Sequence, residues 1–575
     1  MTVDQAFDQR VGARGEDATA ATRYMCAGVH LDQAFAESVV QEIEEEQYRA
    51  FAPSYGVNIM IVHEHATKAL ARIRERDQSI GACLLLSFLL QPAVTVVLLV
   101  VAAFMGGDAT KPLDPRSSRL ARFIPGRRSL SVRVRAVSGA VARMLALFAV
   151  ELLVATVAQA LPAPLVYIHG LVLTTLITYP LLVLLPWVIT WRERTTAWHT
   201  ITGELTAASF HTKYRDTFAN GPATDGNITV YSGYSPFVGS GHELRSWQLS
   251  MHLEPARSIT GEVPHQREPW TVPVGPSGLI EGIAGQLAAL GAETAGPADG
   301  IHGLSVTEKL FVDGTVLRLH DVRSSGLTTA VLPNEEAKPR AQVPDDLVQA
   351  YRGHHHGPIR HCLRIQVAAW GADLVLSVFV QVVISGGTLY LEVTKLLLPP
   401  IKEEFRIADS VAERNTVERL PAVATGSEEE GETVIAAQSV AIGLRALSTA
   451  PAAAFREFRT PARRKRRNAD LLQAIRDDQT FDYGARLSLR ELASGNSYRN
   501  YFQRVDVARI SKLIDMRILD HLAGYLTENG LDISELTDRQ TTILNSGILM
   551  TGGSMSGTIV AGESNTVSTG AGNRK

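Results

Sequence analysis

The chain of 575 residues is 45% hydrophobic and 20% charged, and its formal net charge of −3 conceals strong local asymmetry. Its three cysteines, Cys26, Cys83 and Cys362, lie far apart, which excludes a disulfide framework and fits a reducing compartment. The apolar residues are concentrated in two windows, 81–106 and 137–191, and the first residues lack the apolar core of a signal peptide.

Residues 1–80 predict an N-terminal helical region on the cytoplasmic side. Residues 31–48 carry an apolar side chain at every fourth position, which is typical of an amphipathic helix. The stretch Ala52–Gly56, which contains proline and glycine, ends that helix. Residues 57–77 then predict a second helix that leads into the first apolar window.

Residues 81–107 form an apolar segment that is compatible with two structures, a re-entrant helical hairpin and a single transmembrane helix. The run Leu84–Phe104 has no charged residue and carries Gln91-Pro92 near its middle. Basic residues flank the run on both sides, and basic flanks stay cytoplasmic, so a re-entrant helical hairpin bent at Gln91-Pro92 agrees with the charges. The length of the run instead suits one tilted transmembrane helix, in which proline is tolerated. The sequence leaves both open.

The basic loop 108–136 and the apolar window 137–191 predict a transmembrane helical hairpin. The loop holds eight basic residues, which places it on the cytoplasmic side. The hairpin would then turn outside at Pro162 and return before Arg192. This orientation predicts a multi-pass plasma-membrane protein whose C-terminal region is cytoplasmic.

One charged residue, Glu151, lies within the predicted hairpin, and Arg143 at the edge of the hairpin is its candidate partner. Ionisable residues inside a membrane are costly, so they are functional candidates by default. The pair supports the hypothesis of a transporter or channel component.

Residues 199–420 predict a mostly-β cytoplasmic domain. The clearest element is a hairpin over Leu374–Leu398, in which two β-branched runs flank the turn signal Gly386-Gly387. The runs Ile228–Ser232 and Ser246–Leu253 predict an earlier pair of strands, joined by a glycine-rich hairpin loop. An amphipathic helix at 277–290 is expected to cover a face of the sheet.

The stretch Gly353–Cys362, GHHHGPIRHC, holds the weak candidates for a metal site: His354, His355, His356, His361 and Cys362. These residue types suit zinc, but their spacing matches no helix-borne or knuckle pattern. A loop before a strand is the favoured interpretation, and no metal or cofactor is predicted. The chain also shows no nucleophile elbow and no Ser/His/Asp pattern, so no catalytic residue is proposed and no motif supports an enzyme.

Residues 433–467 predict a second contact with lipid. Their apolar part contains Arg445 and Pro451, which argues against a membrane span. An unbroken basic run follows, made of Arg463, Arg464, Lys465, Arg466 and Arg467. An interfacial apolar segment beside such a run binds anionic lipid, so we expect an anionic bilayer as a partner. The alternatives are a solvated linker and an RNA-binding arm; no nucleic-acid partner is expected.

The C-terminal part divides into a helical domain, residues 470–543, and a tail, residues 544–575. An apolar stripe predicts a helix over 501–529, which Asn529-Gly530 closes. The tail is rich in Gly, Ser and Thr and has two short β-prone cores. It is either disordered or able to stack in register, and stacking would give a protein partner or a homo-oligomer.

Three stretches carry a resemblance: YSGYSPFVGSG (Tyr231–Gly241), FDYGARLSLREL (Phe481–Leu492) and RQTTILNSGILMTGGS (Arg539–Ser554). Together they resemble uncharacterised multi-pass membrane proteins of actinobacteria. The tail resembles, loosely, the amyloid-type signalling motifs of bacterial immune and cell-death proteins. The resemblance implies a location and no activity.

The sequence therefore predicts a membrane-anchored α+β protein with helical transmembrane segments, a mostly-β cytoplasmic domain and a C-terminal helical region. The predicted function is an integral plasma-membrane scaffold or a signalling and assembly component that acts through the cytoplasmic domain. The alternative is the transporter or channel component.

Overall fold

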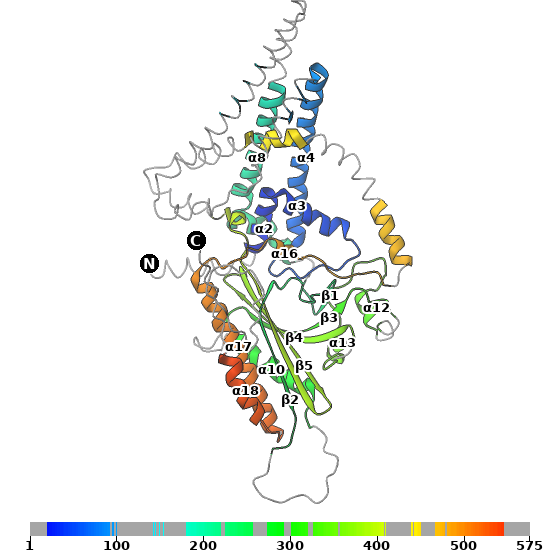
Figure 1. The fold of residues 1–575 in the computed structure, drawn as a ribbon, viewed down its shortest axis with the longest axis vertical. Coiled ribbons are helices and arrows are strands. Elements are labelled where there is room, and N and C mark those ends of the chain that lie inside the picture. Colours follow the sequence, from blue (N-terminus) through cyan, green and yellow to red (C-terminus); the bar gives the residue numbers. More distant parts are fainter. Residues whose placement is uncertain are drawn as a thin grey trace, which may run out of the picture.

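The computed structural model describes residues 20–92, 180–219, 225–256, 273–291, 301–319, 326–354, 357–407, 466–477 and 480–545, with short pieces at 95–96, 99–100, 439–440 and 442–449 and a few single residues. The helices, labelled as in Figure 1, are α2 (Ala20–Leu31), α3 (Gln33–Val40), α4 (Ile59–Leu90), α8 (Leu185–His199), α9 (Ala207–Ala219), α10 (Pro276–Gly291), α12 (Leu327–Val331), α13 (Asp345–Ala350), α16 (Leu489–Leu492), α17 (Tyr501–Glu528) and α18 (Ser534–Asn545). Short π or 3₁₀ turns are η1 (Gln41–Glu45), η4 (Pro180–Leu184), η5 (Thr200–Glu204) and η6 (Glu403–Arg406). The strands are β1 (Ile228–Tyr231), β2 (His242–His252), β3 (Leu304–Asp313), β4 (Ile359–Ala369), β5 (Leu374–Ser385) and β6 (Thr388–Leu398).

A mixed six-stranded sheet is the centre of the fold (Figure 1). Its order is β1-β3-β4-β5-β6-β2; β1 and β3 are parallel, and the other neighbours are antiparallel. The predicted hairpin over Leu374–Leu398 is confirmed as β5 and β6, with Ser385 opposite Thr388. Gly386 and Gly387 both have positive φ, 59° and 76°, which suits the two-residue turns of β-hairpins.

The prediction that the two earlier strands form a hairpin is wrong. β1 and β2 lie at opposite edges of the sheet, where β1 pairs with β3 and β2 pairs with β6. The eleven residues of β2 match the length of β6, whereas β1 has only four residues. The glycine-rich linker between β1 and β2 therefore carries the chain across the sheet instead of turning it back.

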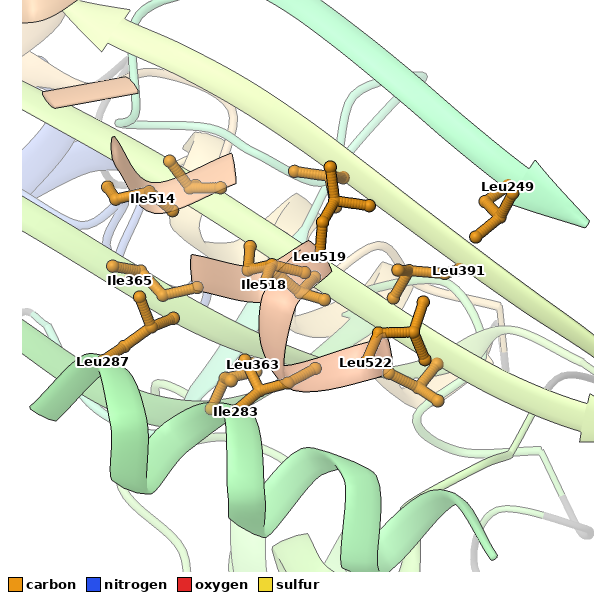
Figure 2. Packing of buried hydrophobic residues seen from close by; sticks show 14 of the residues in the cluster. Leu249, Ile283, Leu287, Leu363, Ile365, Leu391, Ile514, Ile518, Leu519 and Leu522 are labelled. Atoms are coloured by element: carbon orange, nitrogen blue, oxygen red, sulfur yellow. The ribbon is translucent and has the colours of Figure 1, made fainter. Parts of the chain in front are cut away.

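Helices α10, α17 and α18 pack on one face of the sheet and form the first core with it. The predicted helices at 277–290 and 501–529 are confirmed as α10 and α17. Figure 2 shows Ile514, Ile518 and Leu522 of α17 lying against the strands, with Ile283 and Leu287 of α10 beside them. Alternating strand residues such as Leu363 and Ile365 point into this core, because side chains in a strand face its two sides in turn.

The N-terminal helices form a second core of their own. Helices α2, α3 and α9 and the first half of α4 bury residues such as Met25, Ile61 and Phe210, and Phe405 of η6 joins them. Asp32 caps α3 and Asn58 caps α4, each with its side chain accepting two backbone N–H groups. The predicted second helix is thereby confirmed, but α4 runs to Leu90 and includes the first ten residues of the first apolar window.

No helix among the described residues has both the length and the hydropathy needed to cross a membrane. This finding overturns the predicted membrane-anchored fold, the transmembrane segments, the multi-pass plasma-membrane location and the integral scaffold or transporter. The described fold is α+β around one mixed sheet. In α4 the uncharged end, from Gln78 to Leu90, is only about 20 Å long, against the roughly 30 Å of a hydrocarbon core. The loop 108–136 and the predicted hairpin as far as residue 179 lie, apart from a few single residues, outside the described chain.

Candidate functional site

The C-terminal end of α4 exposes a group of large apolar side chains, and η4 and α8 expose further ones beside it. We call these two groups together the apolar end. On α4 the group is Leu85, Leu86, Phe88, Leu89 and Leu90. Leu85 is 60% exposed and Leu89 is 72% exposed. Large exposed apolar patches mark interaction sites, because a folded chain otherwise loses free energy by leaving them in water.

The exposed positions of α4 cover more of the helix than a single contact stripe would need. At 100° per residue they extend over roughly 200°, from Phe88 through Leu85 to Leu90. The remaining side faces inward, where Ser87 is fully buried and its Oγ lies 2.9 Å from Oγ1 of Thr95. An amphipathic helix that binds one surface needs a stripe of about 100°. The end of α4 therefore suits an apolar surrounding better than one partner helix.

Helix α8 lies beside α4 and adds its own apolar residues to the apolar end (Figure 1). These residues are Leu184, Leu185, Val188 and Trp191 of η4 and α8. The rings of Trp187 and Trp191 stack with their centroids 6.4 Å apart. Tryptophan suits a boundary between apolar and wet surroundings, because its ring is apolar and its N–H is polar.

Charged residues begin on both helices where the apolar end stops. Helix α4 carries Arg72, Arg74 and Arg76, and α8 carries Arg192 and Arg194. Arg76 pairs with Asp77 at 2.8 Å and with Glu193 of α8 at 3.5 Å, which ties the two helices together. The molecule thus places an apolar surface, a tryptophan pair and a set of arginines in sequence along one pair of helices.

A chain of hydrogen bonds crosses the second core beside these arginines. Arg72 donates from Nη2 to Nδ1 of His30 at 2.6 Å. Arginine has no acceptor, so Nε2 of His30 carries the proton and donates to Nδ1 of His65 at 3.0 Å. Nε2 of His65 then donates to the hydroxyl of Tyr214 at 2.9 Å. Burial, with the Arg72 charge adding to it, lowers the pKa of His30 to about 2, and burial lowers the pKa of His65 to about 4.

We expect the N-terminal helices to lose stability as the pH falls from 6.5 to 5. Both folded-state pKa values lie below about 6.5, the value in an unfolded chain, so the unfolded state binds more protons in this range. Each histidine then costs about 2 kcal/mol over this interval, and the loss begins as the pH falls through the unfolded pKa. Hydrogen–deuterium exchange of α2 and α4 peptides at several pH values measures the effect.

The matched variant is His30→Gln with His65→Gln, which keeps a donor and an acceptor at each position but does not titrate. It should flatten the dependence on pH, whereas His302→Gln, at an exposed histidine, should leave it unchanged. An equally steep slope in the double variant would assign the loss to other groups.

Two of the stretches that carry the resemblance meet in the structure, at a place we call the junction. Oε1 of Glu491 accepts the backbone N–H groups of Gly239 and Gly241, at 2.9 Å and 2.8 Å. Asp482 accepts the hydroxyl of Ser232 at 2.6 Å. Burial raises the pKa of Glu491. Burial also raises the pKa of Asp482, but hydrogen bonds from Ser232 and Arg49 outweigh it and hold the pKa below its usual range.

The junction also holds the segment between the N-terminal helices. Arg49 pairs with Asp482 at 2.7 Å, and the N–H of Ala50 donates to the carbonyl of Tyr483 at 2.8 Å. The hydroxyl of Ser488 donates to the carbonyl of Pro53 at 3.3 Å. The motif Phe481–Leu492 therefore joins the N-terminal helices to the edge of the sheet. Of the third stretch, residues 539–545 belong to α18, and the remainder lies outside the described residues.

The candidate metal ligands lie apart. Nε2 of His361 donates to Oε2 of Glu308 at 2.9 Å, and Cys362, the next residue of β4, faces the opposite side of the sheet among aromatic rings. His354 packs against the ring of Tyr351. Within the described chain, no three potential ligands gather into a metal site. His355 and His356 are not among the described residues.

The predicted membrane and lipid residues fall mostly outside the described chain. Glu151 and Arg143 are not described, and neither are Arg463, Arg464 and Lys465. Arg467 pairs with Glu45 at 2.9 Å and also with Glu46, so it lies against η1. Lipid contact through 463–467 stays a prediction, as do assembly of the tail and the resemblance to actinobacterial proteins.

Sequence reasoning missed the chemistry of the junction. Asp482 and Glu491 lie in a stretch singled out for its resemblance alone, and their partners are about 250 residues away along the chain. The signal in the sequence was the pair of glycines at Gly239 and Gly241, because glycine adopts positive φ easily. In the structure both residues have positive φ, and their N–H groups point to one carboxylate.

Residues 246–556, more than half of the 575-residue chain, match the model of the AbeC-like domain family. The matched part begins within β2 and includes β3 to β6 with α10 and α17, whereas the apolar end precedes it. No curated protein and no solved structure matches the chain. The chain belongs to the AbeC-like domain family.

Proposed function

We propose that this protein binds a lipid surface through the apolar end and presents its sheet and junction away from that surface. The observation that carries the proposal is the exposure of five large apolar side chains over roughly 200° of α4. A lipid phase can surround such a helix end, whereas a single partner helix covers about half of it.

The order of residues along α4 and α8 supports lipid as the surrounding. The exposed leucines of α4, η4 and α8 come first, then the stacked Trp187 and Trp191, then Arg192 and Arg194. Tryptophan and arginine prefer the interface between the hydrocarbon and the water. Arg74 and Arg192 are exposed in this belt, where basic side chains attract anionic headgroups.

The length of the uncharged end of α4 determines how deeply this helix inserts into the lipid. The thirteen residues from Gln78 to Leu90 give about 20 Å of helix, which reaches into the acyl region of one leaflet. The sheet lies toward the other end of the long axis from the apolar end (Figure 1). A surface bound in this way leaves the sheet and the junction open to partners in the water.

Flotation of the full-length protein with vesicles tests the proposal. The vesicles contain equal parts of phosphatidylglycerol and phosphatidylcholine, and a second set contains phosphatidylcholine alone. Leu86→Gln with Leu89→Gln should weaken binding by about 100-fold, because each leucine gains about 1.5 kcal/mol or more on burial. The anionic vesicles should bind the wild-type protein more tightly than the neutral ones.

The matched control is Tyr501→Gln with Phe502→Gln at the start of α17, where the two side chains are 64% and 65% exposed. This control removes a similar amount of exposed apolar surface, but at a place outside the apolar end. It should therefore float like the wild type. Failure of the wild type to float would refute lipid binding. A wild-type dimer that Leu86→Gln with Leu89→Gln converts to a monomer, with no vesicle binding, would assign the apolar end to a second copy of the chain.

A further inference from the structure

A pocket of about 330 Å³ lies at the edge of the sheet, away from the apolar end. Its floor is Ile228 and Val230 of β1, one wall is Ala50 and Phe51, and the other wall is the segment 338–342. This volume is within the range of sites that hold small molecules.

The pocket exists because the outer edge of β1 is covered only at its ends. The N–H of Ile228 donates to the carbonyl of Ala341 at 3.2 Å, and the N–H of Ala485 donates to the carbonyl of Val230 at 2.9 Å. Between these two bonds no strand covers β1 among the described residues. The wall is held in place, since the N–H of Arg340 donates to the carbonyl of Val331 at 2.8 Å.

Two cationic side chains line this mostly apolar pocket. The ammonium of Lys338 is buried 3.4 Å from the centre of the Phe51 ring, and its Nζ has no hydrogen-bond partner in the part of the chain that is described. Arg340 is exposed and makes no ion pair with any described residue. A buried ammonium without an acceptor is costly, so a ligand that supplies an acceptor would be favoured.

The carboxylates around Lys338 do not remove this need. Burial lowers the pKa of Lys338 to about 8, although Glu42 of η1 and Glu46, the residue after η1, oppose the shift. Burial raises the pKa of Glu42 to about 7. Glu46 is engaged by Arg49 at 3.1 Å and also by Arg467. The positive charge of Lys338 is therefore only partly balanced by Glu42 and Glu46, and an anion in the pocket would complete the balance.

We propose that this pocket binds a small amphipathic carboxylate, with its apolar body against Phe51 and β1 and its carboxylate between Lys338 and Arg340. The four-carbon stem of Lys338 lets Nζ turn from the ring toward a carboxylate. The guanidinium of Arg340 binds a carboxylate through two parallel hydrogen bonds. The apolar floor of Ile228 and Val230 selects an aromatic or aliphatic body over a free inorganic anion.

Ligand-observed fluorine NMR on the full-length protein tests the proposal with 4-(trifluoromethyl)benzoate as the probe. We expect saturable binding of this probe, and 4-(trifluoromethyl)benzamide, which has the same shape without the charge, should bind about 10-fold more weakly. Arg340→Met and Lys338→Met should each weaken the benzoate by about 10-fold. The Arg340 side chain is exposed, so its variant should fold.

Arg476→Met is the matched control, since Arg476 is 67% exposed and pairs with Glu336 outside the pocket. It should bind the benzoate like the wild type. Equal binding of benzoate and benzamide, or unchanged binding in both pocket variants, would overturn the proposal. Loss of benzoate binding in Leu86→Gln with Leu89→Gln would place the probe at the apolar end and overturn it as well.

Discussion

A Lys395→Met variant is expected to lose about 3–5 kcal/mol of stability in the sheet core. The ammonium of Lys395 on β6 is buried and pairs with Asp515 of α17, and Nε1 of Trp247 on β2 donates to the same carboxylate at 2.9 Å. Among the described residues, removing the ammonium leaves this buried carboxylate with only the indole N–H as a side-chain partner. Hydrogen–deuterium exchange of β5 peptides measures the free energy of opening in this core.

The double variant Lys395→Met with Asp515→Asn separates the charge from the packing. The asparagine keeps an oxygen for Trp247 and removes the unpaired charge, so the double variant should recover most of the loss. Lys213→Met is the surface control, because Lys213 is 42% exposed in its pair with Glu204 and should cost about 0.5 kcal/mol or less. A double variant as unstable as the single one would mean that the methionine packs badly and that the charge matters little.

A Gly484→Ala variant is expected to lose about 3 kcal/mol or more by breaking the junction. A Cβ atom at this position would lie 2.1 Å from the carbonyl oxygen of Tyr231 and 2.5 Å from the nitrogen of Ser232. Both are backbone atoms held by hydrogen bonds, since the carbonyl of Tyr231 accepts the N–H of Gly314 at 2.9 Å and the N–H of Ser232 donates to the carbonyl of Ala485 at 3.1 Å, so neither can move aside cheaply. Thermal unfolding reports the loss, and exchange of the β1 peptide shows whether the opening starts at the junction.

Gly285→Ala in α10 is the control for this substitution. Nothing lies within 4 Å of a Cβ atom there, and alanine favours a helix over glycine by about 1 kcal/mol, so this variant should gain stability. If Gly484→Ala were as stable as the wild type, the N-terminal helices would not be joined to the sheet through this stretch.

The sequence predicted those elements whose signal lies within a few neighbouring residues. The stripe of apolar residues at helical spacing gave α10 and α17, and Gly386-Gly387 gave the β5–β6 hairpin. In each case the local backbone preference agrees with the final structure, because residues close in sequence make the contacts that stabilise the element.

The tertiary structure alone decided how these elements combine. A β-prone run offers the same N–H and C=O groups to any partner, so the sequence could not assign β1 to β3 and β2 to β6. Glu491 binds Gly239 and Gly241, and Asp482 binds Ser232, across about 250 residues that no periodicity connects. The apolar residues of α4 can be identified from hydropathy. Hydropathy does not show, however, that the apolar residues near Ile61 are buried in a protein core while those near Leu89 are exposed. That outcome depends on which helices pack beside α4, and packing is a property of the whole fold.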